Sequence, residues 1–467
     1  MTNSAQQAWL PELVYVAGEF QSGLALSCDN EGRIVSVGSA SDALEANPHL
    51  TTTSLKNKAI LPGLINSHSH AFQRVIRGRT EYRSQHSSDS FWTWRELMYR
   101  AANLLDPNDV YIASKMAFLE MALSGCTSVG EFHYLHHAIN GQPYDDPNLL
   151  AKEVIRAATD VGLRIALLRV AYERAGFQTE PNPLQVRFIE QPDSYLKNLE
   201  QLMSCKSEMV WVGAAPHSVR AVSLDYLKDI DRFVKNSNIP IHMHVAEQPA
   251  EVSACIEEYG RSPVALLDTE GLLNRNFTAV HAIHVTPKAI QAIAKNNANV
   301  CACPTTERNL GDGVIPVDEY FRAGVTVSVG TDSQTQIDLL EDTRELEYHL
   351  RLQRKERNVL APASDDGSSL ATRLFECATL NGGKSIGFDG GRFEPGSPAD
   401  FFTVDLNDPA IVGASSDNLL AHIVFSLSRN AVRDVVVHGK RIVEDGRHTS
   451  QENIVSDFKA LQRRLWN

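Results

Sequence analysis

Eight strand-like runs recur along the middle of this 467-residue chain, and amphipathic stretches of helical length separate most of them. Stretches such as 107–124, 148–161 and 194–203 have the apolar spacing of helices that cover a sheet. Strand and helix alternating eight times is the pattern of an α/β fold, the (β/α)8 TIM-type barrel, whose active sites lie where the strands end. The runs span residues 59–65, 127–133, 163–171, 209–215, 239–246, 277–283, 298–303 and 325–330.

The chain is longer than a plain barrel requires, and its hydrophobic content of 43% can fill a large core. Both ends contain short alternating runs, such as 400–404 and 435–443 near the C-terminus. We therefore expect residues 1–61 and 391–467 to combine in one small β-sandwich, completed by a terminal helix. The metal-dependent barrel would then comprise residues 62–390.

A His-x-His pair, His68 and His70, directly follows the first run. In an extended segment alternate side chains point to the same side, so these two imidazoles can bind one metal ion. Alone, such a pair is more often two solvated loop histidines. Here His244, His281 and Asp332 occupy matching positions near the ends of later runs. We therefore expect one metal site at the mouth of the barrel.

Composition excludes several classes of function. The formal net charge of −13 argues against nonspecific nucleic-acid binding, which depends on clustered Lys and Arg. No run approaches the roughly 18 apolar residues of a membrane span, and the N-terminus has no secretory pattern. The seven cysteines lack zinc-ribbon spacing, which indicates reduced thiols. We expect a cytoplasmic enzyme of metabolism without nucleic-acid or membrane partners.

Four motifs combine at these strand ends: the His-x-His, 242–247 (His-Met-His-Val-Ala-Glu), 281–284 (His-Ala-Ile-His) and 330–333 (Gly-Thr-Asp-Ser). Together they resemble the amidohydrolase superfamily, in its aminohydrolase (deaminase) branch. Segments 67–74, 89–100, 131–137 and 309–313 are similar to the formimidoylglutamate deiminases, which convert N-formimino-L-glutamate in histidine degradation. The resemblance spans most of the chain, from the His-x-His to residues 378–383.

The resemblance implies that one divalent metal ion, for which Zn²⁺ is expected, is held by His68, His70, His244 and Asp332. His281 would orient the water beside it. Binuclear relatives use a carboxylated Lys after the fourth strand, and residues 209–217 contain no Lys, which favours one ion.

The expected chemistry is attack by water on the formimino carbon, since bound zinc lowers the pKa of water from 15.7 toward about 7. Asp332 would accept the water proton, and Glu247 would protonate the nitrogen that leaves as ammonia. The product would be N-formyl-L-glutamate. An isolated Glu in place of this matched motif would be read as a solvent-exposed loop carboxylate.

A substrate with two carboxylates requires fixed cationic and hydrogen-bonding groups, and Arg suits a carboxylate. The resemblance assigns this role to Arg95, Tyr134, His217 and Arg220, with Gln73 near the formimino end. The alternative for Arg95 is a helix-surface ion pair, with Glu96 or Asp89. Gln334 stands where relatives often have His or Asn, so a contact beside the metal and the substrate preference could differ.

Residues 78–95 are polar and Ser-rich and form the best candidate for a lid over the pocket. We also expect a homodimer, because relatives of this fold commonly dimerise.

Three alternatives stay open. An aminohydrolase acting on guanine, cytosine or an adenosine derivative would share the metal site, but Arg95, Tyr134 and Arg220 favour an acyclic dicarboxylate. A hydrolase of an amide or ring lactam is disfavoured in its binuclear version by the missing Lys. A catalytically inactive binding protein predicts lost ligands, whereas every expected metal and proton-transfer residue is present.

Overall fold

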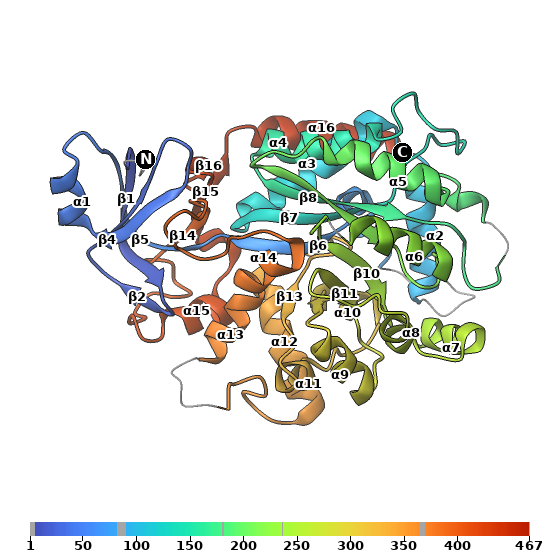
Figure 1. Ribbon diagram of the computed structural model, residues 1–467. Coiled ribbons are helices and arrows are strands. Elements are labelled where there is room, and N and C mark those ends of the chain that lie inside the picture. Colours follow the sequence, from blue (N-terminus) through green and yellow to red (C-terminus); the bar gives the residue numbers. More distant parts are fainter. Residues whose placement is uncertain (1–4, 82–89, 180–181, 236, 364–368, 467) are drawn as a thin grey trace.

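Eight parallel strands form a closed barrel at the centre of the molecule (Figure 1). The computed structural model describes residues 5–81, 90–179, 182–235, 237–363 and 369–466. Each barrel strand pairs with its neighbours in chain order, and the last returns to the first through a parallel bridge between Ser69 and Asp332. The predicted (β/α)8 barrel is therefore confirmed. Its strands are β6 (Leu64–Ser69), β7 (Cys126–His133), β8 (Arg164–Ala171), β9 (Val210–Pro216), β10 (Ile241–Val245), β11 (Phe277–His281), β12 (Asn299–Ala302) and β13 (Val327–Val329).

Helices cover the outside of the barrel, so its strands are buried on both faces and carry apolar residues on both. Six of them have Pro in the first turn, where a missing N–H costs nothing. The helices after η1 (Ala71–Ile76) are α2 (Phe91–Ala102), α3 (Pro107–Leu123), α4 (Leu149–Val161), α5 (Pro192–Met203), α6 (Leu224–Val234), α7 (Pro249–Tyr259), α8 (Pro263–Thr269), α9 (Pro287–Lys295), α10 (Pro304–Leu310), α11 (Val317–Arg322), α12 (Leu339–Arg354), α13 (Leu370–Cys377) and α14 (Leu380–Ile386), with η2 (Pro183–Gln185) between β8 and α5. None of the described helices is long and apolar enough to cross a membrane.

The first expected strand, 59–65, is in fact shared by two strands of different sheets. β5 (Thr51–Pro62) belongs to a second sheet, and β6 starts at Leu64. Pro62 has no N–H for a ladder, and a Cβ on Gly63 would lie 2.3 Å from the Thr127 side chain, so the chain changes sheet at this dipeptide. His68 consequently lies within β6 and not after it.

The second sheet combines both ends of the chain, as expected. Its order is β17-β16-β15-β14-β5-β1-β3-β4, with β2 paired to β1, and β5 joins the two halves by pairing parallel with β1 and antiparallel with β14. Trp9, Leu26 and Phe401 lie in its own apolar core. The N-terminal elements are β1 (Gln7–Val16), β2 (Glu19–Gln21), β3 (Leu24–Cys28), β4 (Ile34–Ser39), α1 (Ala40–Ala46) and β5; the C-terminal ones are β14 (Phe401–Asp405), α15 (Leu419–Ser426), η3 (Arg429–Ala431), β15 (Val432–Val437), β16 (Lys440–Glu444), β17 (Arg447–His448) and α16 (Gln451–Trp466).

Two sets of contacts attach the C-terminal part to the barrel. Arg164, at the start of β8, donates from Nε to Asp400 Oδ2 at 2.5 Å and from Nη2 to Oδ1 at 3.2 Å. Helix α16 lies beside α3 (Figure 1), and both Gln462 Nε2 and Trp466 Nε1 donate to the carbonyl of Val75 in η1, at 3.0 and 3.2 Å. The C-terminal helix thus supports the segment that directly follows His70.

Candidate metal centre and pocket

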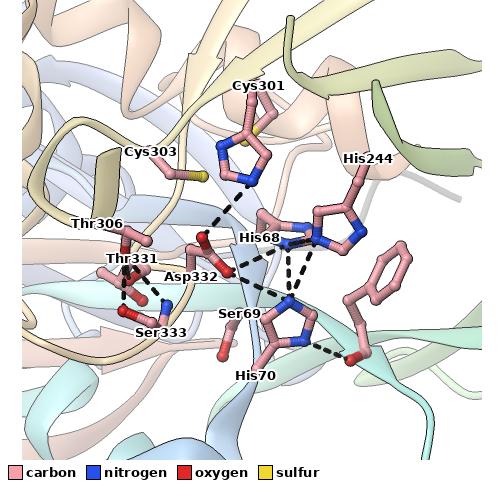
Figure 2. A network of polar contacts seen from close by, with 12 residues as sticks. His68, Ser69, His70, His244, Cys301, Cys303, Thr306, Thr331, Asp332 and Ser333 are labelled. Carbon is pink, nitrogen blue, oxygen red and sulfur yellow. Dashed lines mark hydrogen bonds and ion pairs between the residues drawn. The ribbon is translucent and has the colours of Figure 1, made fainter. Parts of the chain in front are cut away.

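Four side chains converge at one end of the barrel (Figure 2). The Nε2 atom of His68 lies 3.2 Å from that of His70 and 3.1 Å from that of His244, and the last two are 3.4 Å apart. Asp332 Oδ1 is 3.2 Å from His70 Nε2 and 3.6 Å from His68 Nε2. All four residues are buried.

These distances fit a tetrahedral metal site. With Zn–N bonds of about 2.0–2.1 Å, neighbouring ligand atoms of a tetrahedron lie about 3.3 Å apart. His70 Nδ1 donates to the carbonyl of Phe132 at 2.9 Å and His244 Nδ1 to that of His217 at 3.1 Å, which leaves the Nε2 lone pairs facing inward. Burial, and next the neighbouring His70, lowers the pKa of His68 and His244 well below the usual range. The imidazoles of His68 and His244 are therefore in the neutral form that binds metals.

The seam of the barrel, where the segment after β13 meets β6, fixes the position of Asp332. Its N–H donates to the carbonyl of His68 at 3.0 Å, and its carbonyl accepts from the N–H of His70, also at 3.0 Å. Asp332 has a φ of 48°, a left-handed conformation that is uncommon outside Gly. Two residues earlier, a Cβ on Gly330 would lie 2.7 Å from the His68 carbonyl oxygen, so only Gly permits this close approach.

His281 connects the four-residue group with two further carboxylates. Its Nδ1 donates to Glu307 Oε1 at 3.2 Å, while its Nε2 lies 3.7 Å from Asp332 Oδ2 and 3.6 Å from Glu247 Oε1. Burial lowers the pKa of His281, but Glu247, Glu307 and Asp332 outweigh it, so this pKa lies well above its usual range. For the carboxyl group of Glu247, burial has the opposite effect and raises the pKa. Proton donors and acceptors therefore lie beside one another here.

Two buried carboxylates were missed by the sequence reasoning. Glu307, in the first turn of α10, holds His281 and also accepts from the N–H of Cys303 at 2.9 Å. Glu131 in β7 accepts from Ser69 Oγ at 2.5 Å and from the N–H of Ala71 at 2.7 Å, on either side of His70. A charged residue inside an apolar strand run was the available signal for Glu131. Glu307 had no comparable signal.

Gln334, the departure from the expected pattern, lies buried beneath this seam. Its Nε2 donates to Ser69 Oγ at 2.7 Å, and its Oε1 accepts from Thr331 Oγ1 at 3.0 Å. Its side chain therefore contacts the residue between His68 and His70, and not the pocket itself.

The predicted site residues meet in one pocket, with His68 alone lying beneath it against His70 and His244. Of the candidate lid, residues 82–89 lie outside the described part of the chain, while Phe91, Trp94 and Arg95 belong to the pocket wall. The lining consists of His70, Gln73, Phe91, Trp94, Arg95, Met98, Tyr99, Tyr134, His217, Arg220, His244, Glu247, His281, Leu310 and Asp332.

Two arginines bring positive charge into this pocket. The Nη1 atoms of Arg95 and Arg220 are buried without a hydrogen-bond partner, and Arg95 Nη2 donates to the carbonyl of Ala175 at 3.5 Å. Among the described residues neither side chain forms an ion pair. Arg95 stacks near Trp92 and Tyr99, at 5.0 and 5.2 Å from the ring centres. Burial, and then the charge of Arg220, lowers the pKa of Arg95. The helix-surface ion pair with Glu96 is absent; Asp89 lies outside the described residues.

Gln73 and Tyr134 form a polar pair on the pocket wall. Gln73 Nε2 donates to Tyr134 Oη at 2.9 Å, and Gln73 Oε1 is buried without a partner within the described structure. A free carbonyl oxygen on this wall can accept a hydrogen bond from an N–H of a substrate.

Comparison with known proteins gives a consistent result. The model of a family described as "Amidohydrolase family" matches residues 59–442. The chain is 36% identical over 402 residues to a formimidoylglutamate deiminase of Pseudomonas aeruginosa, covering 86% of this chain and 88% of that protein. It is 27% identical to a 5-methylthioadenosine/S-adenosylhomocysteine deaminase of Natronomonas pharaonis, covering 83% and 81%.

Solved structures resemble the whole chain. An amidohydrolase from Brucella melitensis matches with a TM-score of 0.88 at 33% identity, covering 99% of this chain and 100% of that one. A zinc-bound adenosine deaminase from Xanthomonas campestris matches with a TM-score of 0.82 at 21% identity, over 99% of both chains, and thus shares the fold.

Proposed function

The chain belongs to the amidohydrolase family, and on that basis we propose that it hydrolyses N-formimino-L-glutamate to N-formyl-L-glutamate and ammonia. It is a hydrolase of C–N bonds, and the 36% identical relative is named for this reaction. The observation that favours this substrate is the pair Arg95 and Arg220, whose Nη1 atoms are buried without a hydrogen-bond partner in the described structure and which line the pocket that contains Glu247.

His68, His70, His244 and Asp332 would hold one divalent cation, Zn²⁺ by preference, because three neutral imidazoles and a carboxylate suit it. When bound, the cation makes water nucleophilic at neutral pH and polarises the substrate. A single cation is supported by the residues at the end of β9, where no Lys occurs between 209 and 217.

The carboxylates and His281 would move the protons. Asp332 would accept the proton of the attacking water, with His281 Nε2 close to its Oδ2. Glu247, whose pKa is raised by burial, can carry a proton to the nitrogen that leaves as ammonia. Glu307 would hold His281 in place through Nδ1.

Arg95 and Arg220 would bind the two carboxylates, aided by Tyr134 and His217, because charge-assisted hydrogen bonds would satisfy their buried guanidinium groups. Gln73 Oε1 would accept from the formimino N–H. An adenosine derivative, suggested by the other deaminase relatives, is a second candidate, but a neutral base would leave both arginines unbalanced. The homodimer and the cytoplasmic location stay predictions, which light scattering and cell fractionation would check.

The test is ammonia release by zinc-loaded protein from N-formimino-L-glutamate, with guanine, cytosine and adenosine as competing substrates. N-formimino-4-aminobutyrate, which lacks the α-carboxylate, is the matched analogue for the arginines. We expect release from the dicarboxylate alone, and a kcat about 10²- to 10⁴-fold lower for Glu247→Gln. Glu96→Gln makes the same change on the exposed side of α2 and should have full activity. Release only from a heterocycle would disprove the proposed substrate.

A further inference from the structure

A second group of metal-binding side chains adjoins the four-residue group. It consists of His281 at the end of β11, Cys303 directly after β12 and Glu307 in α10, and one ligand atom from each lies within 4.8 Å of the others. All three side chains are buried. The two groups share no residue, and His281 Nε2 of the second lies 3.7 Å from Asp332 Oδ2 of the first.

One oxygen of this second group lacks a partner. Glu307 Oε2 is buried without a hydrogen bond in the described part of the chain, and the side chains of His281 and Glu307 are both about 99% buried. Figure 2 shows the Cys303 sulfur pointing toward Asp332. A buried carboxylate oxygen without a partner is costly unless something binds it.

We propose that His281, Cys303 and Glu307 form a second cation site that takes a borderline-soft divalent ion, Zn²⁺ or Cd²⁺, and that its occupation inhibits the enzyme. Thiolate, imidazole and carboxylate together are a donor set for such ions, whereas Mg²⁺ and Ca²⁺ prefer oxygen alone. The second group is also distinct from the first, because only the second contains sulfur.

Inhibition follows from the use of His281. A cation on Nδ1 replaces the hydrogen bond of this imidazole to Glu307 and, because the ring can then no longer carry a second proton, prevents His281 from taking up the proton that it would otherwise transfer through Nε2. This part of the inference rests on the proposed function, whereas the binding itself does not. Three side chains offer fewer ligands than four, so the second ion is expected to bind more weakly and to fill its site only after the first.

Cadmium titration of the zinc-loaded protein tests the site, because bonds between cadmium and thiolate give a charge-transfer absorption that imidazole and carboxylate ligands do not give. We expect this absorption to saturate near one equivalent and ammonia release to fall in parallel, with recovery on adding a chelator. Cys303→Ser should abolish the absorption and the inhibition. Cys301→Ser is the matched control, since this buried thiol lies two residues earlier, within β12, and outside the group, and it should behave as the wild type.

X-ray absorption of the wild-type protein makes the test independent of whether the variants fold. A sulfur neighbour at about 2.3 Å from zinc should be missing with one equivalent and present with two. Absence of sulfur at two equivalents, or cadmium absorption that persists in Cys303→Ser, would overturn the site. Binding of the second ion in a protein that releases no ammonia from the formimino compound would instead refute the proposed function and leave the site standing.

Discussion

Arg95 places charge in the pocket at a cost to the folded state, because burial disfavours its charged form and lowers its pKa. We expect Arg95→Met and Arg220→Met each to raise the KM for N-formimino-L-glutamate. Losing a charged hydrogen bond of about 1.5–3 kcal/mol corresponds to about 10- to 150-fold. Arg95→Met should also leave the free protein as stable or more stable, so its steady-state kinetics and thermal unfolding should change in opposite directions.

Arg169→Met is the control for this trade-off. Arg169 is fully buried, and its Nη1 lies 2.5 Å from Glu190 Oε2. Removing a partner from a buried ion pair should lower the free energy of unfolding by about 3–5 kcal/mol. If Arg95→Met lost as much stability as Arg169→Met, the charge of Arg95 would have to be balanced in the free protein.

At the scale of elements, the pattern along the chain was enough to predict the barrel and the residues at its strand ends. Alternation and spacing are local properties, and His68 and Asp332 follow, and His244 lies near the end of, runs that can be recognised without their neighbours. The change of sheet at Gly63 was not visible, because it depends on Thr127 in another strand. Glu307 was missed for the same reason, because it lies in helix α10 whereas its partner, His281, lies at the end of β11.

The seam between β13 and β6 gives a second prediction. A methyl group at residue 330 would collide with the His68 backbone, and overpacking costs about 1–3 kcal/mol. We expect Gly330→Ala to lower both the melting temperature and the zinc content per chain. Gly38→Ala, where the added Cβ meets nothing within 4 Å, should change neither. Full zinc content in Gly330→Ala would show that the ligands do not depend on this close approach.

The buried carboxyl group of Glu251 in helix α7 should make the stability of the protein depend on pH. Glu251 in its first turn accepts from the N–H groups of Ala246 and Glu247, and burial raises its pKa from 4.5 to about 7. The folded state therefore holds this proton more tightly than the unfolded chain. Its contribution is complete below pH 4.5 and is lost as the pH rises through about 7, which amounts to about 3 kcal/mol.

Urea unfolding at pH 5 and pH 8 checks this expectation. Glu251→Gln should reduce the difference in unfolding free energy between the two pH values, since the titrating proton is gone. Glu257→Gln, on the exposed face of α7, should retain the wild-type difference. An unchanged difference in Glu251→Gln would assign the pH dependence to other groups.

For the whole molecule, the decisive contact is that between the barrel and the sheet built from both chain ends. Asp400→Asn should leave the buried Arg164 without its charge partner and lower the free energy of unfolding by about 3–5 kcal/mol. The exposed pair between Arg33 and Glu208 offers the control, because Arg33→Gln should cost at most about 1 kcal/mol. Calorimetry measures both, and equal losses would contradict the importance of the buried contact.

The bridge between Ser69 and Asp332 also has a consequence for the newly made protein. During synthesis His68 and His70 leave the ribosome long before Asp332, and the fourth ligand reaches them only when the last strand closes the barrel. An unfinished chain therefore presents histidines without the carboxylate, a set that would bind the proposed metal more weakly. If the site takes zinc as proposed, the zinc retained after dialysis would measure the fraction of correctly closed molecules in a preparation, before any substrate is added.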